Sequence, residues 1–303
     1  LAVEASYYGF LAADYLQRPY VICQKGSAVT SADLDRFRER PVILRVDALR
    51  RAGMNNWARG EWNLNLKSWT SEDRRLAAAL ATEEGHPELA IWALNSKDDR
   101  SYYDLRFPLV FVNQVTEQAG KRKLDTAWVM GLIRTESAMA ADAISAANAR
   151  GLMQVLPGTA AQLAHRYGYA WRGKEQLLQA EDNIVFGTSF LRELMDRFGN
   201  NPVLVTGAYN AGPSAVKKWV ATLPARDAAI WIETLPFHET RDYIPRVLAF
   251  ATIYDWRLQK PVRRISSRMP GLDSSSMGGG SGTAAVAAVA CPETDAVAMS
   301  EAH

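Results

Sequence analysis

Apolar residues recur at helical spacing along most of this chain, and this pattern narrows the folds it can adopt. Val185, Leu191, Leu194 and Phe198 mark one face of a helix that would begin near Asp182 and end at a glycine. Similar stretches of about ten residues end at glycine, proline or asparagine, and the alternating pattern of strands is sparse. The sequence therefore predicts an all-α protein.

The clearest helix signals in the sequence lie in the second half of the chain. Asp125 is placed to cap a helix through Ile133, and another is expected over 157–168. Asn201 followed by a proline begins a further helix, because proline suits the first helical position. A last long helix is expected from Arg241 to Leu258, with Pro245 in its first turn or kinking it.

The 303 residues suggest about two domains. Residues 1–115 contain short helices that fit either stacked helical hairpins or an irregular helical segment, with tryptophans at packing positions (Trp57, Trp62, Trp69 and Trp92). Residues 116–265 form a second helical block. Residues 266–303 are rich in serine, glycine and alanine, which predicts a flexible low-complexity tail.

Composition excludes several classes of protein. The 35 basic and 33 acidic residues leave a net charge of +2, which argues against a nucleic-acid binder. No apolar run approaches the roughly 20 residues that span a bilayer, so no transmembrane segment is expected. The four histidines are far apart and the two cysteines lack metal-site spacing, so no metal or cofactor is expected. A disulfide between Cys23 and Cys291 is disfavoured because the tail would have to fold onto the body.

The chain begins at Leu1 without a basic and apolar leader. We expect that a signal peptide was either cleaved or never present, and that the start is truncated within a helix.

Glu136 is the first candidate for chemistry. Leu132 and Trp128 precede it at four-residue intervals, so its carboxyl group shares a helix stripe with two large apolar side chains. Desolvation there would raise its pKa and keep it protonated, as a general acid requires. The alternative is a glutamate at a helix end, paired with Arg134 or solvated, and periodicity alone favours that alternative.

Three further segments favour a catalytic role for Glu136 over a paired or solvated glutamate. Residues 151–154 combine a glycine with an amide, residues 208–212 end a helix with a tyrosine and an asparagine, and residues 239–241 place a glutamate in a turn. Each segment alone is weak evidence for a functional site. Together they supply an acid, amides, hydroxyls and an aromatic ring, which suit a neutral sugar chain.

The order of these motifs resembles that of the soluble lytic transglycosylases, lysozyme-like enzymes that cut bacterial peptidoglycan. Thr135-Glu136-Ser137, Gly151-Leu152-Met153-Gln154, Ala208-Tyr209-Asn210-Ala211-Gly212 and Glu239-Thr240-Arg241 follow the family's order over about residues 116–259. Larger members carry a ring-shaped α-superhelix before the catalytic domain. The resemblance thus implies a partial superhelical or linker domain followed by a lysozyme-like catalytic domain.

Carried over by position, Glu136 matches the family's single catalytic acid and base, and Ser145 a serine near the substrate's N-acetyl group. The remaining matches line the glycan cleft: Met153, Gln154, Tyr209, Asn210 and Glu239. The chain departs from the family at Asn148, where a glycine is usual. Asparagine tolerates positive φ better than most residues, so we expect the loop to survive.

The resemblance implies a lyase without cofactor or metal. It would break the bond between N-acetylmuramic acid and N-acetylglucosamine and leave 1,6-anhydro ends. No second catalytic carboxylate is needed, and Asp142 is interpreted as a solvated loop residue. The implied location is the periplasm, with outer-membrane association through sequence upstream of this chain. The implied partners are glycan strands and cell-wall synthesis or remodelling proteins.

Other classes stay open at this point. A lysozyme-type hydrolase would use the same glycan and release reducing ends. A non-catalytic peptidoglycan-binding scaffold is a second alternative, because the helical first part could dock partners. A helix-turn-helix protein ranks below both, since the basic cluster at Arg263, Arg264 and Arg268 is small and no basic recognition helix is evident.

Overall fold

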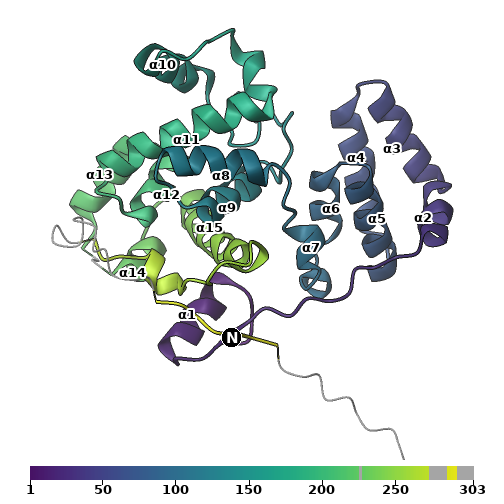
Figure 1. Cartoon of the computed structure of the whole chain (residues 1–303), viewed down its shortest axis with the longest axis horizontal. Helices are drawn as coiled ribbons and strands as arrows, with labels where there is room; N and C mark the ends of the chain where they lie inside the picture. Colours follow the sequence, from purple (N-terminus) through teal and green to yellow (C-terminus); the bar gives the residue numbers. More distant parts are fainter. Residues whose placement is uncertain (225–226, 273–284, 292–303) are drawn as a thin grey trace, which may run out of the picture.

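A computed structural model describes residues 1–224, 227–272 and 285–291, and the prediction of an all-α protein is confirmed (Figure 1). Among these residues the strands are two short ones, β1 (Tyr20–Val21) and β2 (Val289–Ala290). The amino-terminal elements are α1 (Tyr7–Tyr15), α2 (Ser31–Arg38), α3 (Pro41–Arg51), α4 (Asn55–Leu66), α5 (Ser71–Glu83), α6 (Pro87–Ala93), η1 (Lys97–Asp99) and α7 (Tyr103–Arg106).

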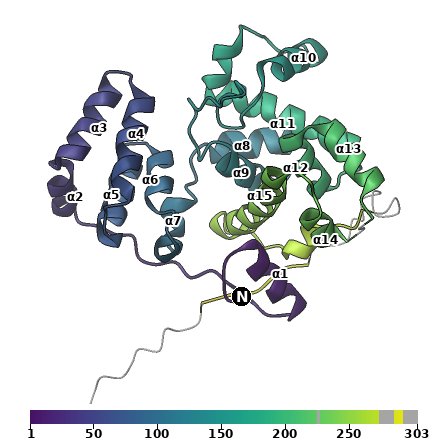
Figure 2. The ribbon, with the colours of Figure 1, turned by 180° about the vertical axis from the view of Figure 1, so that it is seen from behind.

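The remaining helices form a second lobe (Figure 2). They are α8 (Val112–Lys121), α9 (Thr126–Glu136), α10 (Pro157–Tyr167), η2 (Lys174–Leu178), α11 (Ala180–Arg197), α12 (Pro202–Ala211), α13 (Pro213–Thr222), α14 (Ala228–Glu233), α15 (His238–Arg257) and η3 (Ile265–Arg268). No helix among the described residues is both long and apolar enough to cross a bilayer.

The helix ends follow the signals in the sequence, with one difference. The Asp125 side chain accepts from the Ala127 N–H at 3.0 Å, and Asn201 caps α12 in the same way. α15, however, begins at His238 instead of Arg241, so Pro245 lies in the helix interior and not in its first turn. The missing proline N–H removes one helical hydrogen bond there.

The described residues contain two hydrophobic cores. One lies within α2–α7 and includes Trp62 and Trp69. The other fills the second lobe and also takes in Phe10 of α1, which packs beside α15 and η3. The first helix of the chain is thus joined by packing to the second lobe, although α2–α7 follow it in sequence (Figure 1).

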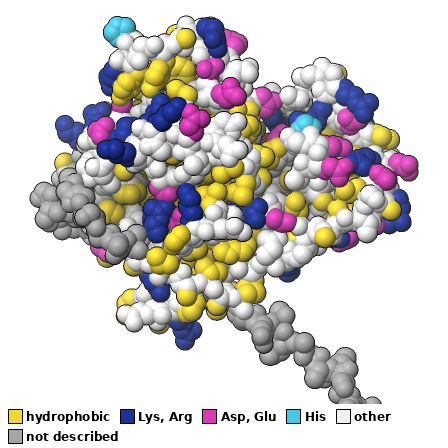
Figure 3. Space-filling model, viewed as in Figure 1, with side chains coloured by type: hydrophobic (Ala, Val, Ile, Leu, Met, Phe, Trp, Pro, Cys, Tyr) yellow, Lys and Arg dark blue, Asp and Glu magenta, His cyan; other side chains and the backbone are white. Residues whose placement is uncertain are grey.

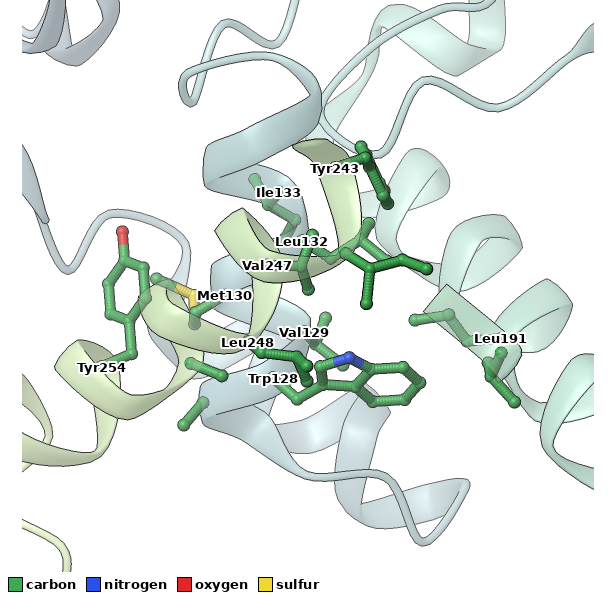
Figure 4. Close-up of a cluster of buried hydrophobic side chains, with 14 of the residues drawn as sticks. Trp128, Val129, Met130, Leu132, Ile133, Leu191, Tyr243, Val247, Leu248 and Tyr254 are labelled. Carbon is green, nitrogen blue, oxygen red and sulfur yellow. The ribbon is translucent and has the colours of Figure 1, made fainter. Parts of the chain in front are cut away.

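α9 and α15 cross at the centre of the second lobe. A Cβ atom at Gly131 would lie 2.8 Å from the Ala251 nitrogen and 2.9 Å from the Val247 oxygen, so only glycine permits this approach. Trp128 and Leu132 are buried in the same cluster (Figure 4), and the Trp128 indole N–H donates to the Thr206 hydroxyl at 3.1 Å. The crossing therefore holds the C-terminal end of α9 in a rigid core.

The described parts of the segment 266–303 differ from the tail expected there. Arg268 is buried and pairs with Asp125 and with Asp255, the latter at 2.6 Å, which joins η3 to α9 and α15. Arg263 pairs with the same two carboxylates, so the basic cluster seen in the sequence is engaged within the protein. The serine and glycine run at 274–280 lies outside the described residues.

The disfavoured disulfide is present, and the expectation against it was wrong. Cys23 and Cys291 are bonded, with their Cα atoms 5.1 Å apart. Tyr20 of β1 pairs in parallel with Val289 of β2, and Ala287 is buried in the core. The pairing of these strands brings the two cysteines together, which spacing in the sequence does not indicate.

Candidate active site

Glu136 ends α9, at the point where the apolar stripe of this helix meets the surface. Tyr243 of α15 donates its hydroxyl to Glu136 Oε1 at 2.5 Å. Burial raises the pKa of Glu136 to about 7, the Tyr243 hydrogen bond lowers it, and the negative charge of Glu239 adds to the rise. Arg134, the alternative partner, instead donates its Nε to the Arg106 carbonyl at 2.8 Å. Glu136 therefore titrates closer to neutral pH than an exposed glutamate does.

The chain turns sharply after Glu136. Ala138 and Met139 both have positive φ, at 51° and 71°, although neither is a glycine and both are buried. Such conformations cost on the order of 1–3 kcal/mol each and persist only where the surroundings impose them. The turn leaves the end of α9, and the Glu136 carboxyl group, at the start of a loop.

That loop is organised by Asn183, a fully buried residue of α11. Its side chain donates to the Arg150 carbonyl at 2.7 Å and to the Leu177 carbonyl at 2.8 Å, and it accepts from the Met153 N–H at 2.7 Å. Gly151 has a φ of 72°, and a Cβ there would lie 2.0 Å from the Leu177 oxygen. The side-chain amide of Asn183 thus holds the backbone of the Gly-Leu-Met-Gln motif in place.

Asn148 takes the glycine-like conformation expected of it, with a φ of 63°. The hydroxyl of Ser145 accepts from the Ala149 N–H at 3.0 Å, and the Asn148 N–H donates to the Ser145 carbonyl at 2.9 Å. The turn forms despite the substitution. Ser145 is exposed, and its described hydrogen bonds lie within its own loop.

Tyr209 of α12 joins the two central motifs. Its hydroxyl donates to the Met153 carbonyl at 2.7 Å, and burial followed by the charge of Glu136 raises its pKa well above the usual value. The Met153 side chain is fully buried against Gly187, so Met153 presents its backbone to Tyr209. Gln154, at a φ of 46°, donates to the Gly151 carbonyl at 2.8 Å. Tyr209 therefore stays neutral beside Glu136.

Asn210 and Glu239 meet at the rim of the site. The Asn210 amide donates to Glu239 Oε1 at 2.8 Å, and the Thr240 hydroxyl donates to Asn210 Oδ1 at 2.6 Å. Glu239 is exposed. Residues from α9, α12 and α15 are thus connected around one acid, with the carboxylate of Glu239 in the surrounding surface.

Asp142 is not the solvated loop residue expected from the sequence. It pairs with Arg59 of α4 and accepts from the Asn55 side chain at 2.9 Å, and these contacts lower its pKa against the opposing effect of burial. Arg59 also lies 3.6 Å from Glu88. The loop after Glu136 is therefore attached to the α2–α7 lobe.

Tyr243 and Asn183 are site residues that the sequence alone did not predict. Tyr243 follows Glu239 by four residues, so a helix that starts at His238 puts both on one face. That earlier helix start is the signal that could have found it. Asn183 is a buried amide in a helix whose apolar face was recognised, and a polar residue there needs partners that sequence does not identify.

An all-helical lobe in which the desolvated carboxyl group of Glu136 lies beside Tyr243 and Tyr209 is the arrangement of a lysozyme-like domain. Three family models match the chain: the transglycosylase SLT domain over 113–232, the soluble lytic transglycosylase helical domain over 234–262 and the soluble lytic murein transglycosylase L domain over 36–97. The chain belongs to the soluble lytic transglycosylase family.

Similar proteins include the soluble lytic murein transglycosylases of Salmonella typhimurium, 32% identical over 84% of this chain and 39% of the relative, and of Escherichia coli K12, 34% identical over 71% and 34%. The structure of a lytic transglycosylase Slt inactive mutant from Pseudomonas aeruginosa has a TM-score of 0.79 and 32% identity, covering 88% of this chain and 43% of that one. The 70 kDa Escherichia coli soluble lytic transglycosylase has a TM-score of 0.77 and 28% identity, covering 90% and 43%. This chain thus spans less than half the length of these proteins.

Proposed function

We propose that this chain cleaves peptidoglycan between N-acetylmuramic acid and N-acetylglucosamine without using water, leaving 1,6-anhydro-N-acetylmuramic acid ends. The observation that carries the proposal is the carboxyl group of Glu136 at the end of α9, because burial raises its pKa to about 7 and so lets it both give and take a proton near neutral pH. The names of the family's members support the reaction class.

The proposed reaction begins with protonated Glu136. Its proton passes to the glycosidic oxygen as the bond from that oxygen to C1 breaks, and the substrate's own N-acetyl group stabilises the positive charge at C1. Glu136, now a carboxylate, takes the proton of the C6 hydroxyl as that oxygen bonds to C1. Intramolecular attack can outcompete water through effective molarity. Ordinary glycosidases use a pair of carboxyl groups, whereas this mechanism needs only that of Glu136.

The surrounding residues have proposed roles in this reaction. Tyr243 would stabilise the carboxylate form of Glu136 through its hydrogen bond, and Tyr209 would hold the Met153 backbone beside the reacting sugar. Ser145, Gln154, Asn210 and Glu239 are proposed to contact the glycan, in keeping with polar side chains at the rim.

The decisive experiment is a digest of purified sacculi followed by mass spectrometry. Products one water lighter than those of a muramidase support the proposal, whereas reducing ends would identify a lysozyme-type hydrolase. Glu136→Gln should abolish cleavage, and the Pseudomonas aeruginosa protein described as an inactive mutant supports this expectation. Glu181→Gln, at an exposed site on α11, is the matched control and should keep full activity.

Binding of sacculi without turnover by the unaltered chain would instead favour the non-catalytic scaffold. Peptidoglycan as substrate leads us to propose the periplasm as the site of action, and association with the outer membrane and with cell-wall synthesis proteins remains part of this proposal. Fractionation of cells carrying the tagged full-length protein tests the location.

A further inference from the structure

A second cavity lies in the second lobe, between the C-terminal end of α8, the end of α10 and one face of α11. It has a volume of about 510 Å³, within the range of small-molecule sites. The α11 face that lines it holds Val185 and Ser189, whereas Gly187 between them meets the Met153 side chain on the opposite face. Helix α11 therefore separates this cavity from the Gly-Leu-Met-Gln motif of the candidate active site.

Two tyrosines form one wall of the cavity. The rings of Tyr167 and Tyr169 stack, with centroids 5.6 Å apart and an angle of 24° between their planes. Tyr169 also packs edge to face on the buried Phe186, which holds the pair in place. Tyr167 is 45% exposed, so its ring is accessible to a ligand. The face of an aromatic ring carries partial negative charge and suits the C–H groups of a sugar ring.

A guanidinium lies against this tyrosine pair. Arg122 donates its Nη2 to the Tyr169 hydroxyl at 3.1 Å and its Nε to the Ser189 hydroxyl at 3.0 Å. Its Nη1 donates to the backbone and side-chain carbonyl oxygens of Gln118, at 3.2 Å and 2.7 Å. These four bonds fix the plane of the guanidinium, and among the described residues they leave one of its five N–H groups, on Nη2, without a partner.

The acceptors around Arg122 are all neutral, and no carboxylate of the described residues lies within 4.0 Å of its nitrogens. The two other cations of the lining have acid partners: Lys121 pairs with Glu117 at 2.5 Å, and Arg192 pairs with Asp196 at 2.7 Å. The Lys121 side chain is 59% exposed and that of Arg192 is 22% exposed, so both are accessible. Three cations thus meet two carboxylates, which leaves an excess of one positive charge.

The carboxylate of Glu193 does not cancel this charge. It lies close enough to Tyr167 to raise the pKa of that phenol, after the larger effect of burial, but it pairs with Arg166 at 2.5 Å. In Figure 3, hydrophobic side chains lie next to side chains of both charges where Figure 1 places α10 and α11. The cavity therefore combines an accessible aromatic ring with one uncompensated cation.

We propose that this cavity binds an acidic sugar, with its carboxylate at Arg122 and its ring against Tyr167. Tyr169 contacts both residues, so the cation and the ring lie within reach of one ligand. The excess of one positive charge matches a carboxylate better than a phosphate dianion, and the remaining Arg122 N–H can donate a charge-assisted hydrogen bond to it. A uronic acid and an N-acetylmuramic acid with a free lactyl group both carry this chemistry. Only the second of these sources rests on the proposed function.

Calorimetric titration of the whole chain tests the proposal with two pairs of sugars. N-acetylmuramic acid is compared with N-acetylglucosamine, and glucuronic acid with glucose, so that each pair differs in a carboxylate. We expect at least one acid to bind about tenfold more tightly than its neutral counterpart, and the tighter acid identifies the source. Equal binding within both pairs, no binding up to about 10 mM, or acetate that binds as tightly as the acids would overturn the proposal.

Variants locate the bound acid. Lys121→Gln and Tyr167→Leu change accessible side chains, and each should weaken binding of the acid about threefold, whereas Arg122→Gln should abolish the preference for the acid. Lys217→Gln, an equal charge change at an exposed site on α13, should bind like the unaltered chain. Asn210→Ala alters the rim around Glu136 and should keep the preference. Unchanged binding in Lys121→Gln and Tyr167→Leu, or loss of the preference in Asn210→Ala, would refute this site whatever the outcome of the sacculus digest.

Discussion

Replacing Glu136 with glutamine should stabilise the protein at alkaline pH, although it removes the proposed catalytic acid. Burial raises the pKa of Glu136 from 4.5 to about 7 in the folded chain. The folded state therefore binds this proton more tightly than the unfolded state does. The stability that the protonated acid contributes is fully present below pH 4.5 and is lost as the pH rises through 7. Glutamine does not titrate, so the variant escapes this loss.

The size of the effect follows from the two pKa values. Their difference of about 2.5, at 1.36 kcal/mol for each pKa unit, gives a full loss of about 3 kcal/mol in the unaltered chain. Between pH 5 and pH 8 the linkage relation gives a change of about 2.5 kcal/mol. This is a large part of the stability of a typical domain.

Urea unfolding of both proteins at pH 5, 6, 7 and 8 measures the effect. The difference in the free energy of unfolding, Glu136→Gln minus the unaltered chain, should grow steadily with pH. The contributions of the other titrating groups are the same in both proteins and cancel in this difference. The exposed Glu181→Gln is the control, and its difference should stay within about 0.5 kcal/mol at every pH. A difference for Glu136→Gln that is flat from pH 5 to pH 8 would show that the acid is not desolvated in the folded protein.

Three further changes probe the groups around this acid. Tyr243→Phe removes the hydrogen bond that lowers the Glu136 pKa, so the alkaline limb of the pH–rate profile on sacculi should move upward by about one pH unit; an unmoved limb contradicts the proposed role. Gly131→Ala should lower the free energy of unfolding by about 1–3 kcal/mol because the new Cβ meets the α15 backbone, whereas Gly120→Ala, which meets nothing within 4 Å, should cause no loss. Asp142→Ala should reduce kcat/KM by about tenfold while the thermal midpoint changes little, and rates equal to those of the unaltered chain would show that the contact with α4 does not position the loop.

Much of the fold could be predicted because helix signals are local. The Asp125 and Asn201 caps and the turn glycine at the end of α10 act within a few residues of their own positions. The environment of Glu136 could be predicted for the same reason, since Trp128 and Leu132 lie on its own helix. The all-α class follows from periodicity, whereas periodicity alone favours a paired or solvated Glu136, and only the motifs that follow it in the sequence favour the desolvated acid.

The contacts that complete the site join residues far apart in the chain, and such contacts produce no periodic pattern in the sequence. Tyr243 lies 107 residues from Glu136, and the contact of Asp142 with Asn55 spans 87 residues. The disulfide joins cysteines 268 residues apart. Solvation of Asp142 was a reasonable interpretation of an acidic loop residue, and only the packing of α4 against that loop provides its partners.

The close crossing of α9 and α15 connects the stability of the lobe to the chemistry of the acid. Gly131 lies five residues before Glu136, and Val247, which it meets, lies four residues after Tyr243. The separation of the helices at Gly131 therefore helps to set the 2.5 Å distance between the Tyr243 hydroxyl and Glu136. Gly131→Ala should consequently do two things at once: destabilise the fold and, by separating the helices, move the alkaline limb in the same direction as Tyr243→Phe. In the double variant the two limb shifts should not add, because both changes act through the loss of one hydrogen bond.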